Sequence, residues 1–305
     1  MNKEFLDLAE QLKSSVSCTV RLNELMSGHT SFKIGGPADI LVLPESIEQL
    51  REVLKVVKET VVPLTLLGNG SNVLVRDKGI RGIVIKLGNM LRHFYEAEDL
   101  LVFGSGYSLA LASYKAMECG KTGMEFAVGI PGSIGGAVYM NAGAYDGEMQ
   151  NIVNCVKVMD LQGNERVLTA EELNFGYRKT SLQNSGLIVT EVTLKMPSGN
   201  KDEIKSKMDD FSHRRISKQP LEMPSAGSMF KRPPGYFAGT LIDQAGLKGY
   251  TVGGAKISTK HAGFVVNVGG ATAADVLQLI KDVQTKIKAG VGVELQPEVL
   301  VIGEE

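Results

Sequence analysis

Side chains able to take part in a reaction occur in three short stretches that are far apart in the sequence. In Phe175–Ser181, the cation Arg178 directly follows the aromatic residue Tyr177. Such a pair can bind an anion through its guanidinium group, or it can belong to an ordinary solvated turn. In Gln296–Val299, the carboxyl group of Glu298 stands in an otherwise apolar expected strand. An acid there usually faces water from an edge strand, whereas a buried one would have a raised pKa and could carry a proton.

The third stretch, Ser225–Pro234, combines hydroxyl groups, a glycine and two cations. Ser228 could be a nucleophile, but the G-x-S-x-G motif that presents a nucleophilic serine is absent from the sequence. No histidine or aspartate partner for it is evident either. A flexible loop is the simple alternative for this stretch.

Glycine is more frequent than usual, and the glycines are clustered. The chain has 35 glycines among 305 residues, above the usual proportion of about 7%. Gly68–Asn72 follows an expected buried strand, and its amide groups could converge on a phosphate; an ordinary strand-end turn explains it equally well. In Gly129–Ala137, only small or apolar residues separate four glycines. Ordering so many glycines costs conformational entropy, which a mere surface turn would not require. We therefore expect a dinucleotide-binding loop there.

A third glycine-containing stretch, Gly104–Leu109, partly matches the Rossmann fingerprint. It follows an expected strand and opens a helix, but Leu109 replaces the third glycine, which close packing of helix on strand needs. Glu125, about 20 residues further on, keeps a nicotinamide dehydrogenase of the Rossmann type as an alternative. A turn followed by a helix cap is the favoured interpretation.

The elements that must position these residues are helices and strands in irregular alternation. Helices are expected over Met1–Leu12, from Ser46, over Ser108–Glu118, over Lys201–Lys218 and from Thr272 to Gly290, and strands over Ile40–Leu43, Val61–Leu67, Ile80–Leu87, Leu100–Phe103, Leu187–Met196, Phe264–Val268 and Glu294–Ile302. This mixture predicts an α+β fold. The charged helix Lys201–Lys218 is the expected link between two domains, 1–200 and 201–305.

Composition and charge exclude several classes of function. Lys plus Arg total 33 and Asp plus Glu total 34, so the chain lacks the basic field typical of nucleic-acid or anionic-membrane binding. The uncharged window Phe126–Tyr145 contains too many glycines, and a proline, to be a membrane span. The three cysteines are dispersed and the four histidines lack metal-ligand spacing. We therefore expect a cytoplasmic protein without a metal site.

Taken together and in order, the motifs resemble those of the UDP-N-acetylenolpyruvoylglucosamine reductase family, whose flavoenzymes complete UDP-N-acetylmuramate for the bacterial cell wall. The stretches that carry the resemblance are Ser31–Asp39, Gly68–Asn72, Gly129–Tyr145, Tyr177–Arg178, Ser225–Lys231 and Gln296–Val299. Each motif is weak alone, but their order and spacing over nearly the whole chain are specific. The resemblance implies a role in peptidoglycan synthesis, and through it in cell shape and division.

The resemblance also implies an α+β fold in which a two-lobed FAD-binding region of the vanillyl-alcohol-oxidase (PCMH) type precedes a substrate-binding domain. The lobes would cover about 1–88 and 89–200, and the substrate domain 201–305. The implied cofactor-binding residues are Gly68, Asn69, Gly70, Ser71, Asn72, Gly132, Ser133, Ile134, Gly135, Gly136, Asn141 and Tyr145. FAD is expected to be non-covalent, with His29 as the residue to check for a covalent link.

The catalytic residues implied by the resemblance are Arg178, Ser228 and Glu298. NADPH would reduce the flavin, and hydride would then pass from flavin N5 to C3 of the enolpyruvyl group of UDP-N-acetylglucosamine enolpyruvate. Arg178 would stabilise the developing enediolate. Ser228 would supply the C2 proton, and a protonated Glu298 would hydrogen-bond the substrate carboxylate.

Residues implied in substrate binding are Tyr177, Arg178, Lys231, Arg232 and Arg214. Two positions depart from the family pattern, because Met229 replaces a common second Phe and Arg232 stands where some members have Asn. The family has two types, one of which has an extra loop with a substrate-binding tyrosine. The interval between the arginine and serine motifs is short here, which indicates the type without that loop. Arg214 and Arg215 are the candidates to replace that contact.

Two further readings of function stay open beside the Rossmann dehydrogenase. One is another FAD-dependent oxidoreductase on the same fold, and the other is a non-catalytic module that binds a nucleotide sugar or a flavin. A Rossmann dehydrogenase would be colourless, so a visible absorption spectrum separates it from the flavoproteins.

Overall fold

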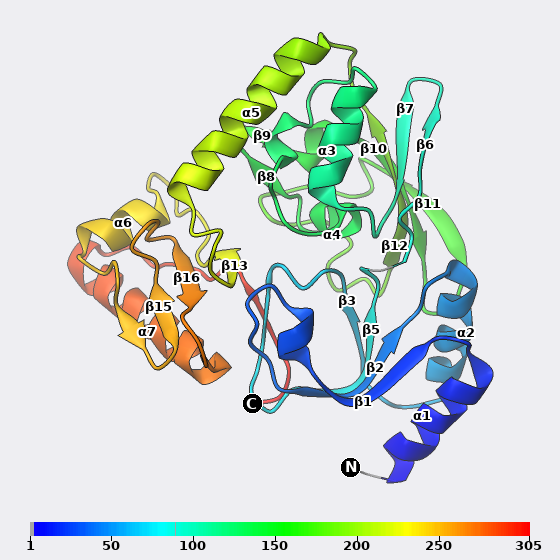
Figure 1. Cartoon of the computed structure of the whole chain (residues 1–305). Coiled ribbons are helices and arrows are strands. Elements are labelled where there is room, and N and C mark those ends of the chain that lie inside the picture. The colour runs from blue at the N-terminus through cyan, green and yellow to red at the C-terminus, as the bar shows by residue number, and fades with distance from the viewer. Residues whose placement is uncertain (1–2, 89) are drawn as a thin grey trace. The chain divides into compact units, whose positions relative to one another are not determined.

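The structure is a computed structural model that describes residues 3–88 and 90–305, so the first two residues of the expected N-terminal helix lie outside the described residues. Helices and strands alternate irregularly, which confirms the α+β fold (Figure 1). Packing divides the chain into two compact units, each assembled from separate segments. Unit 1 comprises the chain up to Leu22, Ile40–Asn69 and Gly82–Arg215, and unit 2 comprises Asn23–Asp39, Gly70–Arg81 and Ile216–Glu305. The expected functional boundary near residue 200 stays a prediction.

The N-terminal part of unit 1 is built on a four-stranded sheet with the order β1-β2-β5-β3. The strands are β1 (Thr19–Leu25), β2 (Pro37–Leu43), β3 (Leu64–Leu67) and β5 (Ile80–Lys86). Helices α1 (Lys3–Ser15) and α2 (Ile47–Lys58) bury apolar residues against it, in a core that includes Leu12, Leu54 and Ile83. Ser46 caps α2 as expected, because its side chain accepts a hydrogen bond from the N–H of Gln49.

The rest of unit 1 contains a five-stranded sheet with the order β11-β10-β12-β7-β6. The strands are β6 (Phe94–Ala97), β7 (Leu100–Gly104), β10 (Val153–Met159), β11 (Glu165–Thr169) and β12 (Ile188–Lys195). Helices α3 (Leu109–Glu118) and α4 (Ile134–Tyr139) share its core with Phe103 and Val192, and Figure 1 places both helices beside this sheet. The long helix α5 (Lys201–Lys218) follows this sheet in the chain. The short elements of the region are η2 (Glu125–Ala127), β8 (Gly143–Ala144), β9 (Gly147–Glu148) and η3 (Met149–Asn151).

The pairing of strand β7 decides whether the Gly104–Leu109 stretch is a Rossmann fingerprint or a turn followed by a helix cap. It pairs antiparallel with both of its neighbours, β12 and β6, whereas the Rossmann unit requires parallel strands around the fingerprint. Ser108 caps α3 by accepting from the N–H of Leu111. The Rossmann alternative is therefore wrong, and the turn followed by a helix cap is confirmed.

Unit 2 contains a four-stranded sheet with the order β13-β16-β15-β14 and a parallel pair, β17-β4. Its elements are η1 (Met26–His29), β4 (Val73–Val75), β13 (Ser225–Ser228), α6 (Ala238–Gln244), β14 (Thr251–Val252), β15 (Ala255–Ile257), β16 (Phe264–Asn267), α7 (Ala273–Val291) and β17 (Leu300–Ile302). Helix α7 begins at the expected capping box of Thr272 and Asp275. It ends at Gly292, which is left-handed, rather than at Gly290.

The expected strand Glu294–Ile302 is mostly irregular. Only Leu300–Ile302 forms a strand, because its partner β4 is three residues long and pairs from Val73 to Val75. Glu298 therefore precedes the strand instead of lying within it. Among the described residues, no helix is long and apolar enough to cross a membrane.

Candidate functional site

Tyr177 and Arg178 are the two central residues of a tight turn in unit 1. The turn is closed twice, since the N–H of Gly176 donates to the carbonyl of Lys179 at 2.9 Å and the N–H of Lys179 donates back at 3.1 Å. Arg178 has φ of +55°, a conformation that L-residues adopt only when surrounding structure holds them there. The side chain of Gln183 supplies one such hold by donating to the carbonyl of Arg178 at 3.1 Å.

The guanidinium group of Arg178 is fixed by main-chain oxygens. It donates to the carbonyl of Asn141 at 3.3 Å and to that of Gly143 at 3.1 Å. Its carbon Cζ lies 5.2 Å from the ring centroid of Tyr177. The half-buried cation is thus oriented in advance, as stabilisation of a developing negative charge requires.

The glycine-rich segment 132–136 meets Gly68 at the side chain of Ser133. The hydroxyl of Ser133 caps α4 by accepting from the N–H of Gly136 at 3.3 Å. Among the described residues, and apart from the adjoining backbone, a Cβ built on Gly68 or on Gly136 would have only this hydroxyl, at 3.4 Å, within 4 Å. The backbone is therefore open to a ligand at both glycines. This geometry fits a dinucleotide that approaches the main chain closely.

Ile134 and Gly135 have a different part in the same segment. The N–H of Ile134 donates to the carbonyl of Tyr107, and the N–H of Gly135 donates to that of Ser105, both at 2.9 Å. A Cβ on Gly135 would lie 2.7 Å from the Cβ of Ser105. These two amides are already used within the protein, so the two residues shape the segment rather than offering donors to a diphosphate.

The loop after β3 contains the other predicted cofactor residues. Gly70 has φ of +67°, and a Cβ there would lie 2.4 Å from the carbonyl oxygen of His29. In the described part of the chain, the N–H groups of Gly70, Ser71 and Asn72 donate to no protein oxygen. A run of such amides around a left-handed glycine is typical of a backbone anion site. Asn69, half-buried, precedes this run.

Two of the predicted catalytic residues, Ser228 and Glu298, are brought together within unit 2. The N–H of Glu298 donates to the carbonyl of Met229 at 2.9 Å, and the N–H of Lys231 donates to that of Gln296 at 2.8 Å. Ser228 ends strand β13 and is exposed, whereas Glu298 is half-buried. The backbone around both residues is locked in one antiparallel pairing.

Asn72 and Ser31 tie further segments of unit 2 to this pairing. The side chain of Asn72 donates to the carbonyl of Glu298 at 3.4 Å, and the carbonyl of Asn72 accepts from the N–H of Leu300 at 3.0 Å. Ser31 donates through its hydroxyl to the carbonyl of Ser225 at 2.7 Å. The family-like stretches around these residues therefore form one connected framework.

The cations predicted to bind substrate differ in their surroundings. Lys231 is half-buried, and Arg232 is exposed with Cζ 4.0 Å from the ring centroid of Phe237. Arg214 is exposed and forms an ion pair with Asp210 at 2.8 Å on the same helix. Such exposed pairs have little rigidity.

Arg215, the second candidate on α5, is buried instead. Its Cζ lies 5.7 Å from the ring centroid of Tyr145, and a Cβ on Gly129 would lie 2.9 Å from its Cδ. Burial lowers the pKa of the Arg215 guanidinium, because desolvation disfavours its charged form. Tyr145 also stacks on Phe211 with ring centroids 4.4 Å apart. Arg215 therefore borders the glycine-rich segment.

A helical pattern in the sequence distinguishes the buried Arg215 from the exposed Arg214. The buried residues of α5 follow each other at spacings of four, three and four, and they are Ile204, Met208, Phe211 and Arg215. That spacing marks one helix face. Arg214 lies off this stripe.

Two other residues singled out in the sequence have structural partners. Glu125 accepts from Thr122 at 2.6 Å and from the N–H of Gly123 at 2.9 Å. His29 lies 2.9 Å, through Nε2, from the carboxylate of Glu24. Among the described residues, no group of three or more metal-binding side chains is arranged around one point.

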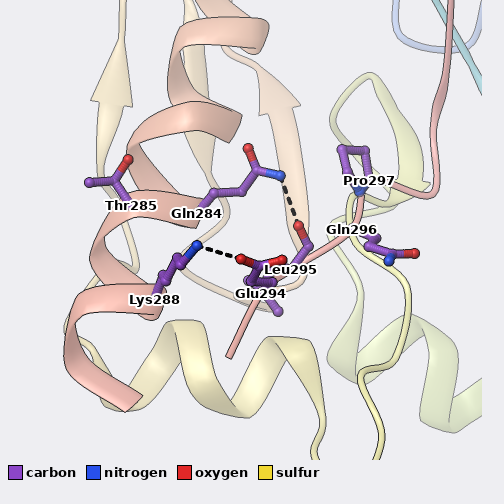
Figure 2. Close-up of a pocket in the computed structure, with 7 residues that line it drawn as sticks. All are labelled: Gln284, Thr285, Lys288, Glu294, Leu295, Gln296 and Pro297. Carbon is purple, nitrogen blue, oxygen red and sulfur yellow. Dashed lines mark hydrogen bonds and ion pairs between the residues drawn. The ribbon is translucent and has the colours of Figure 1, made fainter. Parts of the chain in front are cut away.

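A pocket of about 340 Å³ lies beside the segment that leads to Glu298 (Figure 2). Its lining residues are Gln284, Thr285, Lys288, Glu294, Leu295, Gln296 and Pro297. Gln284 donates to the carbonyl of Leu295 at 2.8 Å, and Lys288 pairs with Glu294. The pocket includes none of the predicted catalytic or cofactor-binding residues.

Comparison with known proteins agrees with this arrangement. Residues 38–169 match the model of an FAD binding domain, and residues 219–302 match that of the C-terminal domain of UDP-N-acetylenolpyruvoylglucosamine reductase. A UDP-N-acetylenolpyruvoylglucosamine reductase of Clostridium perfringens (strain SM101 / Type A) is 50% identical over 302 residues, which cover 99% of this chain and 98% of the relative. The reductase of Caldanaerobacter subterraneus subsp. tengcongensis is 48% identical over 93% of this chain and 94% of its own.

A solved structure extends the likeness to three dimensions. The crystal structure of UDP-N-acetylenolpyruvylglucosamine reductase from Thermus caldophilus is 38% identical, with a TM-score of 0.78. The match covers 93% of this chain and 98% of that one. The predicted FAD-binding fold is thereby confirmed, and the chain belongs to the UDP-N-acetylenolpyruvoylglucosamine reductase family.

Proposed function

We propose that this protein uses NADPH and bound FAD to reduce the enolpyruvyl group of UDP-N-acetylglucosamine enolpyruvate, giving UDP-N-acetylmuramate. The observation that carries the proposal is the backbone pairing that joins the Ser228 and Glu298 segments, in a chain about half identical to reductases of that name. A hydroxyl and a carboxyl group held on neighbouring segments suit addition of a proton next to a carboxylate. The three dispersed cysteines favour a reducing compartment, and we place this activity in the cytoplasm.

The residues that would hold FAD are the open glycines and the unused amides described above. Gly68 and Gly136 leave room at the main chain, and the N–H groups of Gly70–Asn72 can bind a diphosphate. When bound, FAD would supply the hydride chemistry that links oxidation of NADPH to reduction of the substrate. The remaining steps depend on side chains of this chain.

Each proposed catalytic side chain has one role in the reduction of the substrate. Arg178 binds the substrate carboxylate and stabilises the negative charge that spreads into it when hydride reaches C3. Ser228 then donates its hydroxyl proton to C2, which completes saturation of the double bond. If it carries a proton, Glu298 would donate a hydrogen bond to the same carboxylate.

Binding of the nucleotide is assigned to cations and an aromatic side chain. Lys231 and Arg232 follow Ser228 directly and are suited to the diphosphate. Between the two arginines of α5, burial beside Tyr145 favours Arg215 over the exposed, ion-paired Arg214. Tyr177 lies under the Arg178 guanidinium and supports its orientation.

The test separates the two half-reactions in Ser228→Ala. We expect the purified protein to be yellow and, under anaerobic conditions, to be reduced by NADPH at the parental rate. Reoxidation by the enolpyruvyl substrate should be slower by about 10²–10⁴-fold, the usual contribution of a positioned proton donor. Ser206→Ala, which changes an exposed serine of α5, is the matched control and should leave both rates unchanged.

Other results would favour the alternatives. Equal losses in both half-reactions would remove Ser228 from the role of proton donor. Reoxidation by oxygen but not by the enolpyruvyl substrate would indicate another flavin-dependent oxidoreductase. A bound ligand without turnover, unchanged by Glu298→Gln, would indicate a non-catalytic binding module.

A further inference from the structure

Asn141 is a buried, fully hydrogen-bonded polar residue near the proposed catalytic arginine. Its exposed fraction is 0%, and its φ is +42°, in the left-handed region that asparagine tolerates better than most residues. The side chain makes three hydrogen bonds. Its Nδ2 donates to the carboxylate of Glu148 and to the carbonyl of Gly176, and its Oδ1 accepts from the N–H of Gln150, each at 3.0 Å.

These contacts leave Asn141 no side-chain donor for a cofactor. An asparagine amide has two N–H donors, and both are used within the protein. The partners fix the orientation of the amide, because a flipped amide would place its oxygen against two other acceptors, a carboxylate and a carbonyl oxygen. The flavin contact expected at this position from the sequence is therefore not supported by the side chain's geometry.

One side-chain partner of Asn141 and its own main-chain carbonyl link it instead to the Arg178 turn. The carbonyl that accepts its Nδ2 belongs to Gly176, the residue that closes the turn. The main-chain carbonyl of Asn141 itself accepts from Nη1 of Arg178 at 3.3 Å. One residue thus holds the turn by its side chain and the guanidinium group by its main chain.

We infer that Asn141 is a positioning residue for Arg178, setting the direction in which the guanidinium group faces the substrate carboxylate. The inference rests on the proposed function, since it takes Arg178 as the group that stabilises the enediolate. Loss of the side chain leaves the carbonyl of Gly176 with only its bond from the N–H of Lys179, and removes the constraint on the backbone of Asn141. Misplacement of a catalytic group by about 1 Å costs on the order of 10²-fold in rate.

Asn141→Gly is the main test, because glycine keeps the left-handed backbone accessible and removes only the side chain. We expect reoxidation of reduced enzyme by the enolpyruvyl substrate to slow by about 10- to 100-fold. Reduction by NADPH and the dissociation constant for FAD should remain parental. A role as flavin ligand predicts the reverse, namely weaker FAD binding.

A double-mutant cycle gives the readout that a merely structural role would not produce. In an Arg178→Ala background, Asn141→Gly should have little further effect on reoxidation, because its effect passes through the arginine. Additive losses would overturn the inference. An Arg178→Ala variant with parental reoxidation would instead contradict the proposed function itself, so the two failures are distinguishable.

Asn174→Gly is the matched control. Asn174 is also left-handed, with φ of +44°, but it is exposed in a turn of the same unit. The control should leave both half-reactions and the melting temperature close to parental values. If Asn141→Gly does not fold, Asn141→Ser, which retains a short donor, replaces it. Failure of both variants to fold would overturn the inference in favour of a purely structural role.

Discussion

The Arg178 turn of unit 1 and the Ser228–Glu298 pairing of unit 2 hold their functional groups by different means. At Arg178, side-chain amides of Asn141 and Gln183 hold the turn, and the guanidinium group itself is hydrogen-bonded. Around Ser228 and Glu298, main-chain hydrogen bonds align two segments, and the Ser228 hydroxyl is exposed. A charge-stabilising cation has to be fixed before reaction. A proton donor needs a correct backbone and a side chain that can turn toward its target.

This difference predicts that a substitution slows reoxidation most where side chains, rather than the main chain, hold the functional group in position. Arg178→Lys keeps the charge but loses the planar fork that reaches the carbonyls of Asn141 and Gly143. We expect reoxidation by substrate to fall by about 10²–10³-fold, with reduction by NADPH unchanged. Stopped-flow absorbance of the flavin measures both rates. Arg166→Lys, on an exposed part of β11, is the control, and a parental reoxidation rate in Arg178→Lys would break the comparison.

Within unit 1, the glycine-rich segment 132–136 offers a comparison between two glycines, one that is open to a ligand and one that packs against the protein. Gly136→Ala adds a methyl group on the open side, so we expect FAD affinity to fall by about tenfold, or roughly 1.4 kcal/mol. The apoprotein should be no less stable, since alanine favours a helix.

Gly135→Ala is the contrasting variant, since its methyl group would lie 2.7 Å from the Cβ of Ser105. We expect it to destabilise the apoprotein by about 1–3 kcal/mol. Thermal melting of the apoprotein and titration with FAD distinguish the two variants. Parental FAD affinity in Gly136→Ala would place the diphosphate elsewhere.

Asn72→Ala tests a side-chain tie in the region held mainly by the backbone. It removes the donor to the carbonyl of Glu298 but leaves the main-chain bonds from Glu298 to Met229 and from Leu300 to residue 72. One neutral hydrogen bond contributes about 0.5–1.5 kcal/mol, so reoxidation should slow by roughly 2- to 10-fold. Asn154→Ala, at an exposed strand position, is the control. An effect larger than that of Asn141→Gly would reverse the comparison.

Features with local signals could be predicted from the sequence. The bounds of α5 agree with the expected Lys201–Lys218, and α7 begins at the expected Thr272–Asp275 capping box. Caps and helical periodicity depend on residues within a few positions of each other, so one sequence contains them. The motif stretches around Ser228 and Glu298 could likewise be identified by order and spacing.

Features that depend on distant partners could not be predicted. The last strand was expected from Glu294 but begins at Leu300, because the length of β4 limits the pairing. Ile134 and Gly135 were expected to bind the cofactor, and the sequence did not show that their amides donate to the carbonyls of Tyr107 and Ser105. In both cases the deciding partner lies more than 20 residues away in the chain, where local patterns carry no information.

The discontinuous make-up of unit 2 limits how this protein can be divided or recombined. A fragment that begins at residue 219 would carry Ser228 and Glu298 but would lack β4, on which β17 pairs in parallel. It would also lack the loop whose Phe32 and Lys33 carbonyls accept from the buried side chain of Asn267. Neither a single proteolytic cut nor a single gene fusion point near residue 200 would release a complete folding module. Transfer of unit 2 to a relative as a folding module therefore requires its three chain segments to be transplanted together.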